Sequence, residues 1–253
     1  METKDAAELR GFPRHAIGVL SPLGGADTMP YGMYRLLGPE FIVISVSLAL
    51  ASFKPEDIER AVAAIEPQVE HLVARGADLI LQSGTPLALS LGPAGLEQLL
   101  ARVHDKSGRP VLSSALNAVE AARAVGVRKV VAANKWNETI NRNLAAFFAH
   151  YDIELVGTAA ESQEPAQFQR ADLRAGAELA YRLGREALER TPEADALLIG
   201  GGAWFADPAA AALERAFGRP VITSLNGAVR GILKALGRWR PFPQGTGRVL
   251  EAE

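Results

Sequence analysis

Short apolar runs and longer amphipathic segments alternate along the whole chain. The apolar runs are rich in β-branched residues and end in glycine, proline or polar residues, which is typical of buried parallel strands that lead into loops. The expected strands are residues 16–20, 41–50, 77–81, 111–112, 129–133, 154–156, 196–199 and 221–222. Strands that alternate with helices predict an α/β fold with parallel sheets flanked by helices.

The segments between these strands have apolar positions at helical spacing. One helix is expected to open at Lys54, because proline and acidic residues follow there and belong in a first helical turn. Its apolar positions then recur every three or four residues. The other expected helices are residues 96–103, 115–125, 139–151, 173–190 and 227–236.

Two stretches of the sequence occur twice. Residues 77–85 (ADLILQSGT) resemble residues 194–202 (ADALLIGGG), and residues 108–114 (GRPVLSS) resemble residues 218–224 (GRPVITS). The repeat predicts two pseudo-symmetric lobes with a ligand cleft between them, at the carboxyl ends of the strands. We expect a first lobe of residues 16–115 and 227–250, a second lobe of residues 116–226, and an N-terminal tail of residues 1–15.

Composition limits the classes of function. The formal net charge is −2 over 253 residues, so the chain has no basic field to attract nucleic acid or an anionic membrane. No apolar run approaches the ~20 residues that a membrane-spanning helix needs. The N-terminus lacks the apolar centre of a signal peptide. The expected location is therefore the cytoplasm, with no nucleic-acid or membrane partner.

The chain contains no cysteine, which excludes disulfides, thiolate metal sites and thiol catalysis. Its four histidines show no metal-ligand spacing, so we expect no metal site. The sequence has neither a P-loop nor a G-x-G-x-x-G dinucleotide fingerprint. We therefore expect a protein that works without a cofactor.

The glycine-rich turns after the repeated strands are candidates for anion binding. Gly84 and Gly201 follow strands at matching points of the repeat. A residue without Cβ lets backbone N–H groups reach a ligand, and consecutive amides form a nest for an anion. Ser83 and Thr85 add hydroxyl groups, and Gly202 adds another amide, so a small carboxylate would fit. The alternative is that both are ordinary strand-to-helix turns.

A polar segment at residues 134–138 is the third candidate. Lys135 could neutralise an anion or move a proton, Glu138 could act as a base, and Asn134 and Trp136 could contact the substrate. The alternative is a helix start, with Asn137 as the N-cap and Glu138 in the first turn.

Further candidates for substrate binding lie after the first strand and after the triple glycine. Ser21 and Pro22 end the first strand, where the alternative is a simple loop. Trp204 could line the pocket from the second repeat.

Taken together, these residues resemble the aspartate/glutamate racemase superfamily, in its maleate isomerase and arylmalonate decarboxylase branch. The resemblance runs from Ile17 to Leu250 and is clearest at residues 17–22, 76–85, 125–130, 141–147 and 196–202. It implies two pseudo-symmetric α/β lobes that hold a small carboxylate between them without a cofactor. Family members often form oligomers, so the resemblance also implies that this chain can form a homo-oligomer.

The chain departs from the family pattern at the catalytic positions. Many members use one or two cysteines, one in each lobe, and these align with Gly84 and Gly201. Thr85 matches a threonine of the anion pocket, but the next residue, often serine, is Pro86. Trp136 stands where the family has a pocket tyrosine. The resemblance therefore implies the fold and the carboxylate cleft, while thiol chemistry cannot run unchanged.

Two functions remain open at this stage. The first is a cofactor-free lyase, decarboxylase or isomerase acting on a small carboxylic acid, in which Lys135, Glu138 or Ser83 moves the proton. The second is a carboxylate-binding protein that has lost catalysis. A hydrolase with Ser83 as nucleophile is weaker, because no histidine lies at a predicted strand end to activate the serine.

Overall fold

The computed structural model describes residues 13–23, 28–168 and 172–253. The strands are β1 (His15–Ser21), β2 (Phe41–Ser47), β3 (Leu79–Gln82), β4 (Val111–Ser113), β5 (Lys129–Asn134), β6 (Glu154–Ala160), β7 (Ala196–Ile199) and β8 (Val221–Thr223). The helices are α1 (Met29–Leu37), α2 (Pro55–Ala63), α3 (Ile65–Ala74), α4 (Thr85–Ser107), α5 (Ser114–Ala124), α6 (Glu138–His150), α7 (Pro165–Phe168), α8 (Leu173–Arg190), α9 (Asp207–Phe217), α10 (Ser224–Ala235) and α11 (Arg248–Glu251).

The strands form two four-stranded parallel sheets of the same topology. The first sheet has the order β2-β1-β3-β4 and the second has the order β6-β5-β7-β8. Ile17 of β1 pairs with Val43 and Leu79, and Val131 of β5 pairs with Leu197 in the equivalent register. Each strand of the first sheet therefore has a counterpart four strands later, which confirms the predicted fold class.

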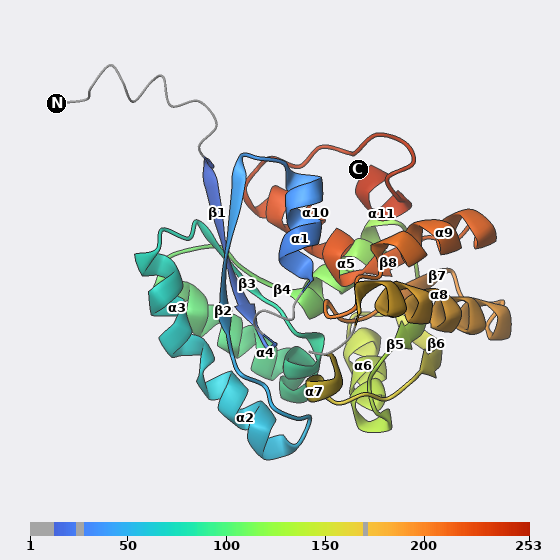
Figure 1. Ribbon diagram of the computed structural model, residues 1–253, viewed down its shortest axis with the longest axis horizontal. Helices are drawn as coiled ribbons and strands as arrows, with labels where there is room; N and C mark the ends of the chain where they lie inside the picture. Colours follow the sequence, from blue (N-terminus) through green and yellow to red (C-terminus); the bar gives the residue numbers. More distant parts are fainter. Residues whose placement is uncertain (1–12, 24–27, 169–171) are drawn as a thin grey trace.

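Two helices cross from one sheet to the other. Helix α5 follows β4 of the first sheet, yet Val119 and Ala122 pack against Val130 of the second. Helix α10 follows β8 of the second sheet, yet its apolar face packs against Ile17 and Leu79 of the first. The two helices also pack against each other near the centre of the molecule (Figure 1). This exchange agrees with a change of lobe near residues 115 and 226, although the exact lobe boundaries stay a prediction.

Some elements differ from the sequence-based expectation. Helix α4 begins at Thr85, 11 residues before the predicted start at Leu96. The prediction missed its first part because Gly92 and Pro93 interrupt the helical pattern, and Gly92, with φ 65° and ψ 175°, is indeed a non-helical kink between two helical parts of α4. Strand β2 ends at Ser47 rather than residue 50, and Ala49 just beyond it has φ 52°. Most of the predicted N-terminal tail lies outside the described residues, and its last residue, His15, opens β1.

Two features are absent from residues 13–23, 28–168 and 172–253. None of the helices there is both long and apolar enough to span a bilayer. The same residues contain no group of three histidine, aspartate or glutamate side chains arranged to hold a metal ion.

Candidate active site

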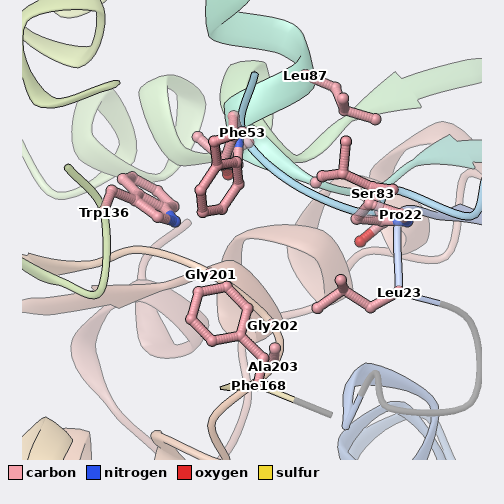
Figure 2. Close-up of a pocket in the computed structure, with 14 residues that line it drawn as sticks. Pro22, Leu23, Phe53, Ser83, Leu87, Trp136, Phe168, Gly201, Gly202 and Ala203 are labelled. Carbon is pink, nitrogen blue, oxygen red and sulfur yellow. The ribbon is translucent and has the colours of Figure 1, made fainter. Parts of the chain in front are cut away.

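A cavity of about 40 Å³ lies where the two sheets meet. Since one water occupies roughly 10–15 Å³ on this measure, the space suits the head group of a small acid. Figure 2 shows the rings of Phe53, Trp136 and Phe168 around one side and Pro22 and Leu23 on the other. The lining residues are Pro22, Leu23, Leu50, Phe53, Ser83, Gly84, Thr85, Pro86, Leu87, Trp136, Phe168, Gly201, Gly202 and Ala203.

The lining residues lie in the loops and helices that follow the carboxyl ends of six strands. Residues 22–23 follow β1, residues 83–87 follow β3 and residues 201–203 follow β7. Parallel α/β sheets bind ligands at this edge because their loops and helix N-termini gather there. The sequence repeat therefore leads to a single cavity, with contributions from both sheets.

The two glycine turns need glycine for different reasons. Gly84 has φ 91°, and a Cβ there would lie 2.7 Å from Cγ of Pro22. Gly201 has φ 98°, with only ordinary contacts around an added Cβ. Gly200 lies outside this positive-φ range, but an added Cβ would lie 2.5 Å from Cη2 of Trp136. The indole of Trp136 thus occupies the space that a side chain at position 200 would use.

Hydrogen bonds hold both turns in place. The buried Gln82 donates through Nε2 to the carbonyl oxygens of Ser83 (2.5 Å) and Gly84 (3.2 Å). Thr28 donates from its amide and its hydroxyl to the carbonyl oxygen of Gly202, at 3.2 and 2.5 Å. Sequence reasoning missed Gln82 and Thr28, because neither belongs to a recognised motif.

Several donors on residues that line the cavity have no acceptor in the described part of the chain. They are the amides of Gly84, Thr85 and Gly202 and the hydroxyl of Thr85. Gly84 and Thr85 stand at the N-terminus of α4, where the helix dipole favours a negative charge. The Gly201 amide is not available in the same way, because it donates to Oγ of Ser224 at 3.0 Å.

Trp136 contributes a wall and a donor. The residue is 3% exposed, and its indole nitrogen would lie 3.9 Å from a Cβ built on Gly201. The nitrogen is on the side of the ring that faces the cavity in Figure 2. Relative to the tyrosine that the resemblance implies at this position, tryptophan would offer an N–H in place of a hydroxyl.

Asn134 supports Trp136 and does not line the cavity. Its Oδ1 accepts from the Trp136 amide at 2.9 Å, and its Nδ2 donates to Oδ1 of Asn141 at 2.7 Å. Asn141 in turn donates to the Trp136 carbonyl oxygen at 3.1 Å. The predicted substrate contact is thus a positioning residue in the structure, and Asn141 is a second one that sequence reasoning did not single out.

Lys135 lies behind the cavity wall, buried to 3% exposure. Its Nζ has no hydrogen-bond partner among the described residues, and it stands 4.1 Å from the centre of the Phe168 ring and 5.4 Å from that of Trp204. Burial away from water lowers the pKa of the Lys135 amine to about 8. The ammonium is therefore caged by aromatic rings, and Phe168 stands between it and the cavity.

Three other predicted site residues do not reach the cavity. Glu138 has a side chain that is 87% exposed and paired with Arg142 at 2.7 Å. It starts α6 after the N-cap Asn137, whose side chain accepts from the Ile140 amide, so the helix-start alternative is the correct one. Trp204 donates to the carbonyl oxygen of Gly200 and packs behind the second turn. Ser21, fully buried, ends β1 and pairs with Ser47 of β2.

The other predicted residues, Pro22, Ser83, Gly84, Thr85, Pro86, Trp136, Gly201 and Gly202, do line the cavity. The lining residues that sequence reasoning missed are apolar, among them Leu50, Phe53 and Phe168. Apolar loop residues carry no chemical signature, and only the fold brings these two phenylalanines together, with ring centres 6.1 Å apart.

Comparisons with known proteins agree with this geometry. The arylmalonate decarboxylase family model matches residues 17–250. An arylmalonate decarboxylase from Bordetella bronchiseptica is 25% identical over 93% of this chain and 96% of its own length. The solved structure of a liganded arylmalonate decarboxylase variant, with one glycine changed to cysteine and one cysteine to serine, has 25% identity and a TM-score of 0.82. It covers 93% of this chain and 98% of its own.

A maleate cis-trans isomerase from Nocardia farcinica, solved with TRIS bound, shows the same fold. It has a TM-score of 0.82 at 21% identity, over 94% of this chain and 98% of its own.

Proposed function

We propose a function from the premise that this chain belongs to the arylmalonate decarboxylase family. In our proposal it is a cofactor-independent enzyme that binds a carboxylic acid between the two glycine turns and carries out lyase or isomerase chemistry without a cysteine. Decarboxylation is the reaction that we favour.

Carboxylate binding is supported by the unsatisfied donors that line the cavity from both sheets. The amides of Gly84 and Thr85 and the Thr85 hydroxyl come from the first turn, and the Gly202 amide comes from the second. Trp136 adds an N–H next to the second turn. Hydrogen bonds to a charged acceptor are stronger than neutral ones, by a factor of about two. This convergence of donors on one small cavity is the observation that carries the proposal.

The character of the walls favours decarboxylation over proton abstraction. Within residues 13–23, 28–168 and 172–253, the cavity is lined by no ionisable side chain. Racemisation and proton-shift isomerisation require a base beside the reacting carbon, whereas loss of CO₂ requires none. Leu50, Phe53 and Phe168 form apolar walls that disfavour a charged carboxylate and favour neutral CO₂.

The electron balance of this step is simple. The bond between the α-carbon and one carboxylate breaks, and its electron pair moves onto the α-carbon and the retained carboxyl group as an enediolate. Donors at the glycine turns would stabilise that developing charge. A proton then adds to the α-carbon and completes the product. Lys135 and Ser83 remain the candidates within the chain for delivering it, with solvent as the other source.

Lys135 would act only if the Phe168 ring moved aside, because that ring lies between Nζ and the cavity. In the closed arrangement its positive charge still favours an anion nearby, since little water screens it. Glu138 is withdrawn from the proposal because it pairs with Arg142 at the surface.

A carboxylate-binding protein without catalysis is the second candidate. It is favoured by the same lack of an ionisable group on the described cavity wall, because a binding site needs donors but no acid or base. Ligand-dependent thermal stabilisation without turnover would identify it.

The test is to incubate the protein with substituted malonates, maleate, and amino and hydroxy acids in deuterated water, and to follow each by NMR. Decarboxylation is expected to place one deuterium on the product carbon, and Thr85→Val to slow the reaction. Exchange or isomerisation without loss of CO₂ would refute the favoured reaction. Absence of any turnover, together with thermal stabilisation by the acids, would support the binding protein.

A further inference from the structure

A second, much larger space adjoins the cavity. It is a groove of about 760 Å³ between α2, α4 and α6. Phe53 and Pro86 line both the groove and the cavity, so the two spaces share a wall. Helices α2 and α4 follow strands of the first sheet and α6 follows β5 of the second, so the groove, like the cavity, lies between the two halves.

The groove is predominantly apolar. Ile58 and Val62 of α2, Leu91 of α4 and Ile140 of α6 line it. The first three are only partly buried, so this apolar surface is left uncovered. Glu59 is the one charged side chain among the described lining residues. The groove therefore has the chemistry to bind a hydrocarbon group, with no counter-charge for an anionic one.

The sizes of the two spaces assign different parts of a ligand to each. About 40 Å³ accommodates a carboxylate and the carbon that bears it, and the rings of Phe53 and Phe168 limit growth in that direction. Phe53 and Pro86 line both spaces, so an arm that extends past these two residues would enter the groove.

We propose that the groove is the subsite for an apolar arm of several carbons, carried by the acid whose carboxylate binds at the glycine turns, and that Phe53 sets the length at which the arm enters it. This inference rests on the proposed function, because it takes the carboxylate to be anchored in the cavity. It assigns Phe53 as a specificity-determining residue and α2 as part of the binding surface.

The experiment measures the affinity of straight-chain carboxylates from acetate to octanoate by calorimetry. The dissociation constant is expected to change little for the shortest acids and then to fall by up to about fourfold per added methylene, since burying one is worth about 0.8 kcal/mol. Ala63→Trp, at an exposed groove position at the end of α2, is expected to remove that gain and leave acetate binding unchanged. Ala101→Trp, at an exposed position of α4 outside the groove, is the matched control.

The outcomes separate the two proposals. Acetate binding with no gain for longer acids would overturn the subsite and leave the proposed function standing. An equal loss of octanoate affinity in both tryptophan variants would also overturn it, because the gain would then not depend on the groove. Failure of every acid to bind would overturn both.

Discussion

Replacing Lys135 by methionine is expected to make the protein more stable. The pKa of the buried amine is lowered from 10.5 to about 8, and each pKa unit corresponds to about 1.4 kcal/mol. Holding the ammonium in the folded state at pH 7 thus costs roughly 3 kcal/mol. Cation–π contacts with Phe168 and Trp204 offset about 1–2 kcal/mol of this cost. Methionine fills a similar volume without charge, so we expect a net stabilisation of about 1–2 kcal/mol.

The pH dependence of the free energy of unfolding tests independently whether the buried Lys135 ammonium destabilises the folded state. Because the folded-state pKa lies below the unfolded value, the unfolded chain binds more protons between about pH 8 and 10.5. The free energy of unfolding of the wild-type protein should therefore rise with pH across this window, relative to Lys135→Met. Below pH 8 the difference between the two proteins should be constant.

Urea unfolding at pH 7, 8, 9 and 10 measures this difference. Lys129→Met, at the start of the strand that precedes Lys135, is the control, because Lys129 is exposed and its removal changes the charge without relieving burial. A less stable Lys135→Met variant, or a difference that stays constant from pH 7 to 10, would refute the reasoning. If the stabilised variant also binds carboxylates more weakly, that loss cannot be attributed to unfolding.

Three further predictions concern the glycine turns and their donors. Thr85→Val should weaken carboxylate binding at least tenfold by calorimetry, since a hydrogen bond to a charged group contributes about 1.5–3 kcal/mol. The substitution should leave the melting temperature nearly unchanged. An unchanged affinity would contradict the assignment of the Thr85 hydroxyl as a donor to the ligand. Gly84→Ala should lower the free energy of unfolding by about 2–4 kcal/mol, measured with urea, because the strain of the positive φ and the clash with Pro22 add together. The control is Gly126→Ala, with φ 70° and no atom within 4 Å of the added Cβ, which should cost only about 1–2 kcal/mol. Equal costs would show that Pro22 moves aside without a penalty. Gly200→Cys should be strongly destabilising beside Trp136 and much less so in a Trp136→Phe background, so a double-mutant cycle with a coupling below about 0.5 kcal/mol would contradict the steric reading of that pair.

The sequence predicts most of the fold because the fold depends on local patterns. Apolar runs located all eight strands, and the internal repeat predicted that the turns at Gly84 and Gly201 are equivalent. Helix α1 escaped prediction because Pro30 and Gly32 weaken its pattern. A Cβ added at Gly32 would lie 2.3 Å from Cδ2 of Leu225 in α10, so a larger residue there would have to displace the Leu225 side chain. A contact between residues so distant in sequence leaves no local trace.

The site was predictable where it depends on backbone and not where it depends on tertiary packing. Glycine turns and Thr85 are visible as motifs. Glu138 satisfied the sequence pattern equally well as a base or as a first-turn acid, and only the direction of its side chain decides between them. Phe53 lies in the loop after β2 of the first sheet and Phe168 in α7 after β6 of the second, so no spacing rule connects them.

The exchange of α5 and α10 between the sheets restricts how a ligand can enter. Each sheet is covered by the helix that follows the last strand of the other, so the halves cannot swing apart without exposing both apolar faces. Access must then come from side chains and loops at the rim, and not from hinged opening of the whole molecule. For the same reason, neither sheet has all the helices that cover it within one continuous stretch of sequence. A chain cut after residue 115 should therefore yield two fragments that fold only when mixed.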